Sequence, residues 1–423
     1  MISINHHKSV FFYLLLILPF ALITGPLIPE IIINIINIFF LLNFLKKKKI
    51  IDKTNKKIIF VMLLIIFYCL IINIINNLDK EQIFKNFFYF RFFIFFFSIS
   101  WILDDEIKIK KFLSIVVIAI ILIVFDLIFQ YIFSFNLLGF DALENYKKGM
   151  MFAETTEITE IKRYSGFFGD ELIAGSYLSK FFILALIYFL IKKSNFLKFF
   201  CFIILVFFGI YLSGERSSMM TFLFAFFMMV FLFKNNLRYI FFALIILFTI
   251  LLNFNSSLKQ RFLNDEPFNI ILSYNLDKKE FFAKLKNTNH ALLFNNSYNL
   301  IKKKPFFGYG YKGFKRNCST YKMDVVDNKI CSTHPHNYYL DILTSFGFFG
   351  LLLFLSLFLI IAVKTFRISK EFQNITIILY LSLFFIAASG SFFNNWISII
   401  IWLNIGFLYR LSKVNYSYFP NIK

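Results

Sequence analysis

Charged residues, prolines, glycines and cysteines are all scarce in this chain. Of its 423 residues only 16% are charged, against 59% hydrophobic and 21% aromatic, and there are 7 Pro, 15 Gly and 4 Cys. So much apolar surface exceeds what one soluble core could bury, which excludes a soluble globular protein and leaves lipid as the main solvent. No internal repeat and no soluble domain large enough to fold alone is visible, so we expect a single integral membrane domain over residues 1–423.

Acidic residues are fewer than basic ones, 24 against 45, and the net charge is +21. Nucleic-acid binding would need this charge on one accessible face, whereas it is scattered between apolar runs, so we expect no nucleic-acid partner. With both termini cytoplasmic, the tails and short inner loops would hold 22 of the 45 Lys and Arg, and the short outer loops only Lys80, Lys85 and Arg216. This positive-inside asymmetry predicts a multi-pass protein of the bacterial inner membrane.

Apolar runs long enough to cross the bilayer predict an all-α polytopic fold with about 12 transmembrane helices. No small-residue cleavage site follows the first run, so we expect it to be retained rather than removed as a signal peptide. The predicted spans are 10–24, 28–45, 58–76, 87–103, 112–133, 173–191, 199–213, 217–233, 239–254, 346–363, 374–390 and 396–412.

Two long polar segments would lie on the outer, periplasmic side. The first covers 134–172 and includes an acidic stretch at 154–160; the second covers 255–345, between the ninth and tenth predicted helices, and is expected to carry the active site. Within it we expect short helices near 277–286 and 290–303. The first of these opens with an N-terminal capping pattern, Asp277 followed by Glu280.

Only two of the four cysteines fall in a compartment where they could pair. Cys318 and Cys331 lie in the second polar segment, where an oxidising periplasm permits a disulfide, and two free thiols are the equal alternative.

Histidine is also rare, with five residues, and none has a metal-ligand partner at helical spacing, so we expect no metal. His334 and His336 stand just before the tenth predicted span. A neutral imidazole there could act as a general base. Taken by residue type alone, an interfacial histidine that hydrogen-bonds to a neighbour is the more frequent case.

Two arginines accompany the histidines on the predicted outer face. Arg163 precedes the sixth span, and Arg216 sits in the turn Ser213–Ser218. Guanidinium groups bind phosphate oxygens in pairs and keep their charge, which suits a lipid diphosphate. The alternative is that each arginine anchors a helix end among lipid headgroups.

Three ionisable residues fall inside apolar runs, where they are costly unless paired or facing water. These are Arg91, Asp126 and Lys180. A pair between Arg91 and Asp126 is the simplest interpretation, and Lys180 would face a substrate cavity. The glycine pattern at 308–313 matches a dinucleotide-binding motif, but no strand, helix and second strand surround it, so we interpret it as a turn.

In their order and sidedness these elements resemble the O-antigen ligase and O-antigen polymerase superfamily of membrane glycosyltransferases, over roughly residues 160–395. His336 and Asn337 are followed by nine residues, Gly347, two Phe and Gly350, which fits the superfamily's His motif. Three further segments are similar to other elements of that family: Arg163–Phe168 to its Arg-x-x-Gly-x-Phe element, the turn at Arg216 to its Gly-x-Arg turn, and Lys304–Gly310 to its Asn-Pro-Leu-Phe-Gly-x-Gly segment.

The resemblance implies metal-independent, inverting transfer of a glycan from undecaprenyl diphosphate, without a cofactor. His336 would be the base, Arg163 and Arg216 would bind the diphosphate, and His334 and Asn337 would support them. A ligase acting on lipid A core is favoured, and a repeat-unit polymerase, a protein O-oligosaccharyltransferase and a flippase or transporter remain alternatives. The implied partners are the lipid-linked glycan, the lipid A core or glycan acceptor, and the bilayer.

Overall fold

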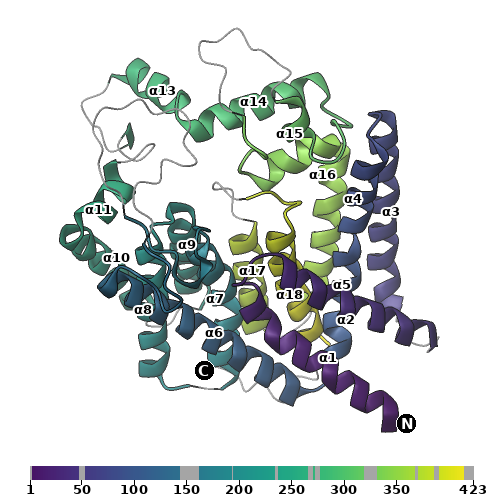
Figure 1. Ribbon diagram of the computed structural model, residues 1–423, viewed down its shortest axis with the longest axis horizontal. Helices are drawn as coiled ribbons and strands as arrows, with labels where there is room; N and C mark the ends of the chain where they lie inside the picture. Colours follow the sequence, from purple (N-terminus) through teal and green to yellow (C-terminus); the bar gives the residue numbers. More distant parts are fainter. Residues whose placement is uncertain are drawn as a thin grey trace.

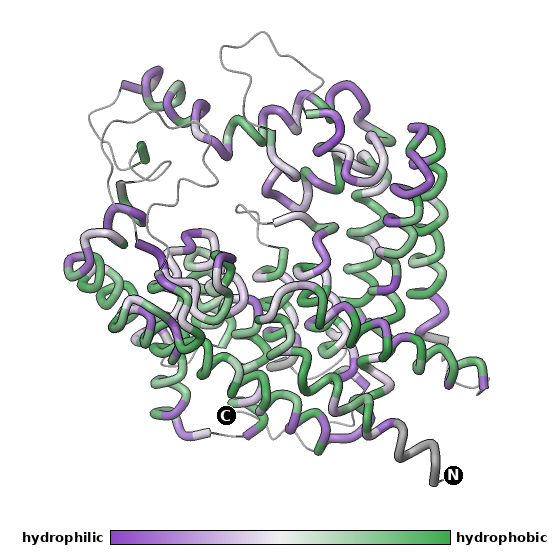
Figure 2. Tube along the Cα trace, viewed as in Figure 1, coloured by the Kyte–Doolittle hydropathy of each residue, from purple (hydrophilic) through white to green (hydrophobic). Residues whose placement is uncertain are grey.

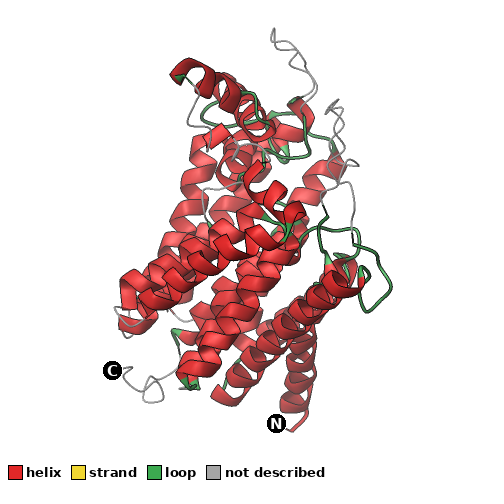
Figure 3. Cartoon of the chain, turned by 90° about the vertical axis from the view of Figure 1, so that its left-hand side faces the viewer, coloured by secondary structure: helices red, strands yellow, loops and turns green. Residues whose placement is uncertain are grey.

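The computed structural model describes residues 2–46, 53–142, 162–192, 194–233, 237–264, 270–271, 277–318, 331–366, 370–384 and 390–413. In this part of the chain the backbone is helix and loop, with one isolated β-bridge between Phe135 and Asp141 and no strand (Figure 3). The all-helical prediction is therefore confirmed. The acidic stretch at 154–160 and residues 47–52 of the predicted basic inner loop lie outside the described residues.

Every predicted span falls on an apolar helix (Figure 1). The helices are α1 (Ile2–Ala21), α2 (Leu27–Lys46), α3 (Lys53–Ile75), α4 (Lys80–Tyr89), α5 (Arg91–Ile102), α6 (Glu106–Phe133), α7 (Ala174–Ile191), α8 (Phe196–Ser213), α9 (Arg216–Phe233), α10 (Leu237–Phe254), α16 (Tyr338–Thr365), α17 (Lys370–Leu383) and α18 (Asn395–Leu411).

Eight segments of the described chain are long and apolar enough to cross a membrane, namely α2, α3, α4 with α5, α6, α7, α8, α9 and α16. Helix α10 continues into α11 (Ser256–Lys259) and a π-helical turn, η2 (Gln260–Asn264), and would add a ninth span if the pair, bent by 117°, counts as one. Helices α1, α17 and α18 are apolar but shorter. A multi-pass membrane protein follows from this pattern, while the count of twelve crossings stays a prediction.

Aromatic side chains fill the centre of the bundle. Helix α18 packs along α5, where the Trp402 indole meets Phe93 and Phe96 with ring centroids 5.0 and 6.2 Å apart. Other close pairs are α6 with α7 and α8, α16 with α3, and α17 with α9. Figure 2 shows hydrophobic residues along these helices and hydrophilic ones gathered in the polar segment at one end.

At the other end of the bundle, the first and last helices both contact the turn between α5 and α6. The carboxylate of Asp104, in the turn between α5 and α6, pairs with Lys8 of α1 and with Lys108 of α6. Arg410, at the end of α18, donates to the backbone carbonyls of Leu103 and Asp104. The residues gathered here were all predicted to lie on the inner side, and they do share one end of the molecule.

After α11 and η2, the described part of the polar segment contains the short helices α13 (Lys278–Lys286), α14 (Asn289–Lys303) and α15 (Gly313–Asn317). The expected helices near 277–286 and 290–303 are confirmed, with Asp277 capping α13 by accepting from the Lys279 amide. Because α16 begins at Tyr338, the polar segment ends eight residues earlier than the predicted 345.

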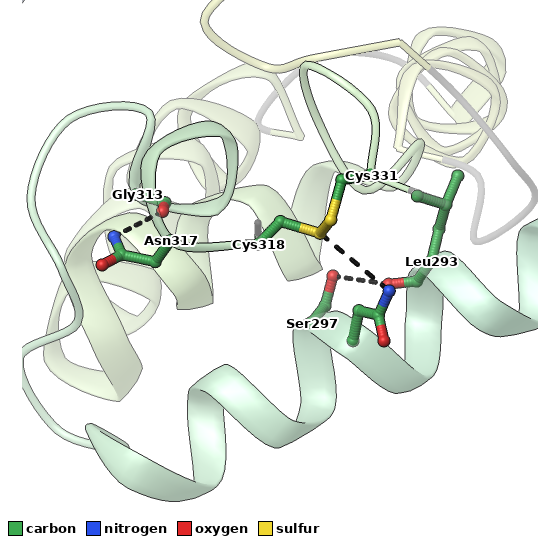
Figure 4. The surroundings of a disulfide bond; sticks show 7 residues. Leu293, Ser297, Gly313, Asn317, Cys318 and Cys331 are labelled. Atoms are coloured by element: carbon green, nitrogen blue, oxygen red, sulfur yellow. Dashed lines mark hydrogen bonds between the residues drawn. A yellow bond between two sulfur atoms is a disulfide. The ribbon is translucent and has the colours of Figure 1, made fainter. Parts of the chain in front are cut away.

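A disulfide joins Cys318, directly after α15, to Cys331 (Figure 4). Cys318 is buried beside Leu293 and Leu300 of α14, and Asn296 donates to its sulfur at 3.9 Å. Of the two alternatives, the structure has the disulfide rather than two free thiols. It fixes the chain three residues before His334 against α14.

Candidate functional site

A cavity of about 1220 Å³ lies at the end of the bundle that carries α14 and α15. Its lining comes from all six connections that the topology prediction puts on the outer side, and from none of the predicted inner loops. Representative lining residues, one from each connection in chain order, are Pro26, Lys85, Arg163, Arg216, His336 and Asn394. The predicted alternation of the spans explains why these segments converge.

His336, Arg163 and Arg216 all line this cavity, as do His334, Arg91 and Lys180. Asp126 and Asn337 are buried outside the lining. The three residues on which the sequence argument depended are thus gathered at one site, although they come from three separate segments.

The backbone at His336 is unusual, because φ is +55°, a region that non-glycine residues rarely adopt. The next residue, Asn337, caps α16 by accepting from the amides of Tyr339 and Leu340 at 2.9 and 3.1 Å. A capping asparagine is held by the helix start, so it fixes the chain entering the span. Asn337 therefore positions His336 from behind rather than contacting the cavity.

Three imidazoles form a row in the cavity wall. The His336 ring lies between His334, at a centroid distance of 4.2 Å, and His290 of α14, at 5.6 Å. The Ser332 hydroxyl is 3.4 Å from His336 Nε2. Burial, followed by the neighbouring His334 and His290, lowers the pKa of His336 to about 3, and burial followed by Lys312 lowers that of His334 to about 4. At neutral pH both rings are uncharged and able to accept a proton.

Arginine side chains converge on the turn between α8 and α9. Gly214 ends α8 with φ +64°, Arg163 donates from Nε to the Ser213 carbonyl at 3.2 Å, and Arg261 donates from Nε to the Gly214 carbonyl at 3.3 Å. Arg216 is the first residue of α9. Three guanidinium groups from three segments thus surround one turn beside the cavity.

Glu215 holds this turn to the start of α7. Its carboxylate accepts from the Gly175 and Ser176 amides at 2.7 and 3.1 Å and from the Ser218 hydroxyl at 2.9 Å. A carboxylate at a helix N-terminus is favoured by the unpaired amides and the helix dipole. Lys180, one turn along α7, donates to the Ser176 hydroxyl at 2.6 Å and lines the cavity. Glu215 therefore links α7, α8 and α9 beneath the arginines.

The predicted pair between Arg91 and Asp126 is wrong. Arg91 forms a two-pronged ion pair with Glu30 of α2, at 3.0 and 2.5 Å, because α5 packs against α2 and α18 while α6 packs against α7, α8 and α1. Asp126 instead accepts from the Leu137 amide at 2.8 Å and fixes the start of the polar segment that follows α6. Both residues are structural in this arrangement, although Arg91 still borders the cavity.

Cations outnumber carboxylates in the lining. The cations are Lys85, Arg91, Arg163, Lys180, Arg216, Arg261 and Lys312, and the carboxylates are Glu171 and Glu215. Such an excess favours an anionic ligand. Within the described ranges no group of three or more His, Cys, Asp or Glu side chains could hold a metal ion, and metal independence stays a prediction.

Part of this chain matches a known protein family. Residues 199–355 match the family described as O-Antigen ligase. The resemblance to the O-antigen ligase superfamily is confirmed. The matched O-antigen ligase region contains Arg216, Arg261, His290 and His336, whereas Arg163 lies before it. None of the curated proteins matches the chain.

The motif glycines Gly347 and Gly350 both lie in α16, and a Cβ on Gly350 would overlap the Phe346 side chain. Gly347 interrupts α16 with φ +66° and ψ −170°, and a Cβ there would overlap the backbone of Phe306. The segment 305–310 crosses the helix at this break: Gly310 donates to the Ser345 carbonyl at 2.7 Å, and Phe348 donates to the Pro305 carbonyl at 2.8 Å. Gly308 and Gly347 therefore let two backbones come into direct contact at the break in α16. The glycine pattern at 308–313, which matches a dinucleotide-binding motif in the sequence, lies in this crossing segment and ends at the first residue of α15.

Arg261 and His290 are among the cavity residues of the matched region that the sequence argument did not single out. Both lie in the polar segment, far in sequence from the residues that they join. The available signal was the position of Arg261 seven residues after the ninth predicted span, a place comparable to that of Arg163 and Arg216 near other spans. Nothing in the sequence around His290 distinguishes it from a solvated helix residue.

Proposed function

We propose that this chain transfers a glycan from undecaprenyl diphosphate to an acceptor hydroxyl on the periplasmic face of the inner membrane, as an O-antigen ligase acting on lipid A core. The observation that carries the proposal is the cavity shared by His336, Arg163 and Arg216. It combines a neutral imidazole with guanidinium groups, which are the groups needed to deprotonate an alcohol and to bind a diphosphate.

The donor diphosphate binds among Arg163, Arg216 and Arg261. The acceptor oxygen attacks the anomeric carbon from the face opposite the diphosphate, so the configuration inverts. His336 takes the hydroxyl proton, the new C–O bond forms, the bond from the anomeric carbon to the diphosphate oxygen breaks, and undecaprenyl diphosphate leaves. The arginines offset the negative charge that grows on the leaving group. Because the leaving group is already good, this scheme requires no metal.

The basicity of His336 depends on the donor. With a pKa lowered to about 3 by burial and the neighbouring imidazoles, the His336 ring is uncharged and available but weakly basic. A diphosphate bound beside it favours the imidazolium and raises its pKa. Donor binding would therefore prepare the base, and the proton would be taken only when the leaving group is in place.

The membrane orientation belongs to the same proposal. Both termini would be cytoplasmic, since the basic residues gather in the predicted inner loops. The cavity would then open to the periplasm. The lipid chain of the donor would stay in the bilayer, beside the helices that border the cavity.

The test is transfer by the purified full chain from undecaprenyl diphosphate-linked glycan to lipid A core. We expect His336→Ala, Arg163→Gln and Arg216→Gln each to lower the rate about 10²-fold or more while the protein stays folded. Arg238→Gln, at the far end of α10 from Arg261, is the matched control and should transfer normally. Full activity of His336→Ala would remove the base from the mechanism.

The same assay separates the alternatives. A product on a second repeat unit rather than on lipid A core would mean a polymerase, and a product on a protein hydroxyl would mean an oligosaccharyltransferase. Movement of the lipid-linked glycan across the bilayer without any new bond would mean a flippase. In a deletion strain, loss of all long glycan from the surface lipid would support the ligase, whereas surviving single-repeat caps would support the polymerase.

A further inference from the structure

A second group of cations lines the cavity on the other side of the histidine row. At one end of the row, His290 lies close enough to Arg216 and Arg261 for both to lower its pKa, after the larger effect of burial. At the other end, His334 lies beside Lys312. With the rings at centroid separations of 5.6 and 4.2 Å, His336 stands between an arginine side and a lysine side.

Lys312 is held in place by its backbone. It has φ +53° and caps the start of α15, directly after Tyr311, whose amide donates to the Asn73 side chain at 2.9 Å. The Lys312 ammonium lies 5.4 Å from the Tyr311 ring. In the described part of the chain no carboxylate forms an ion pair with Lys312. The nearby Asp341 carboxylate instead accepts hydrogen bonds from the Ser391 hydroxyl and the Phe392 amide.

Lys85 of α4 also lines the cavity, close enough to Lys312 to lower its pKa. Lys85 forms an exposed ion pair with Glu81, one helical turn away in α4. Such exposed pairs are weak, so Lys85 can readily bind another anion instead. Burial lowers the pKa of Lys312, with Lys315 and Lys85 adding to the effect and Asp341 opposing it. Two ammonium groups that repel each other across a cavity are stabilised when an anion binds between them.

We propose that Lys312 and Lys85 bind an anionic group, phosphate or carboxylate, on the glycan that accepts the transferred sugar. This inference rests on the proposed function. If the arginine side holds the donor diphosphate, the hydroxyl that His336 deprotonates must arrive from elsewhere in the cavity, and the lysine side is the cationic wall next to His334. A negative charge on the acceptor would then direct its hydroxyl to the base.

The experiment measures binding, so it does not depend on turnover. The probe is the core oligosaccharide of a lipid A core, titrated onto the full chain in detergent. Three forms are compared: intact, dephosphorylated, and carboxyl-reduced. The test variant is Lys85→Gln with Lys312→Gln. The matched control is Lys80→Gln with Lys315→Gln, which removes the same charges from α4 and α15 outside the cavity lining.

We expect the test variant to bind the intact oligosaccharide about tenfold more weakly than wild type, at low salt, and the control to bind as wild type. Loss of affinity on dephosphorylation identifies phosphate as the bound group, and loss on carboxyl reduction identifies carboxylate. An unchanged melting temperature shows that the test variant is folded.

The inference is overturned if wild type does not bind the intact oligosaccharide, if both modified forms bind as well as the intact one, or if the lysine variant binds normally. Glycan transfer in the same preparation is a separate measurement. Lysine-dependent binding without transfer would count against the proposed function alone, and transfer without lysine-dependent binding would count against this inference alone.

Discussion

At the scale of single residues, the protonation of His336 gives a pH prediction. Its pKa is lowered from 6.5 to about 3, so the imidazole is in its basic form at every pH above that value. The pH dependence of kcat/KM reports the pKa values of the free enzyme. We therefore expect no decrease in kcat/KM from protonation of His336 as the pH falls from about 8 to about 5. The limb in kcat should lie at higher pH, because the bound diphosphate raises the pKa. A kcat/KM limb near 6.5 would mean a solvated imidazole.

Glu215 gives a second prediction at this scale. Glu215→Gln keeps the size of the side chain but replaces an accepting oxygen with an amide nitrogen that cannot accept from the Gly175 or Ser176 amide. We expect a loss of about 1–3 kcal/mol in the free energy of unfolding. The variant should also raise KM for the donor, since Arg216 is the next residue. Glu171→Gln, which changes another carboxylate of the lining, is the control and should leave the unfolding free energy unchanged.

Residue types and order allowed His336, Arg163 and Arg216 to be predicted, because each stands at the edge of an apolar run on the same predicted side. The partner of Arg91 could not be predicted, because it depends on which helices pack together. Glu30 lies 61 residues away in sequence, and hydropathy contains no information on whether α5 meets α2 or α6. The place of His290 at the cavity depends on packing in the same way, whereas the position of Arg261 after a predicted span was a usable signal.

At the scale of elements, the break in α16 gives a third prediction. Gly347 has a backbone conformation that is essentially restricted to glycine, and any Cβ would overlap Phe306. We expect Gly347→Ala to cost at least about 3 kcal/mol of stability, measured by chemical unfolding in detergent. Gly139→Ala is the control, since Gly139 also has positive φ but has no atom within 4 Å of its missing Cβ. Equal losses in the two variants would mean that the contact with Phe306 does not matter.

Helix positions were predictable from hydropathy, and helix breaks were not. The runs at 87–103 and 239–254 each lie within one apolar segment, as predicted, but hydropathy did not indicate the turn at Phe90, where α4 and α5 join, or the 117° bend that follows α10. Neither site has a proline or glycine. The start of α16 was placed late because Tyr338–Ser345 is only moderately apolar, although Asn337 is a suitable capping residue.

At the scale of the whole molecule, the alternation of inner and outer connections was predicted from charge, and six outer connections do meet at one cavity. Which face of the membrane that cavity opens to is the remaining prediction. In a Cys201→Ala background, Lys85→Cys would place a thiol on an exposed site at the cavity, and Lys198→Cys would place one on an exposed site at the start of α8, in a predicted inner loop. We expect a membrane-impermeant maleimide to label the first in intact spheroplasts, and the second only after permeabilisation. The opposite pattern would put the histidine row in the cytoplasm and remove the basis for a periplasmic glycan transfer.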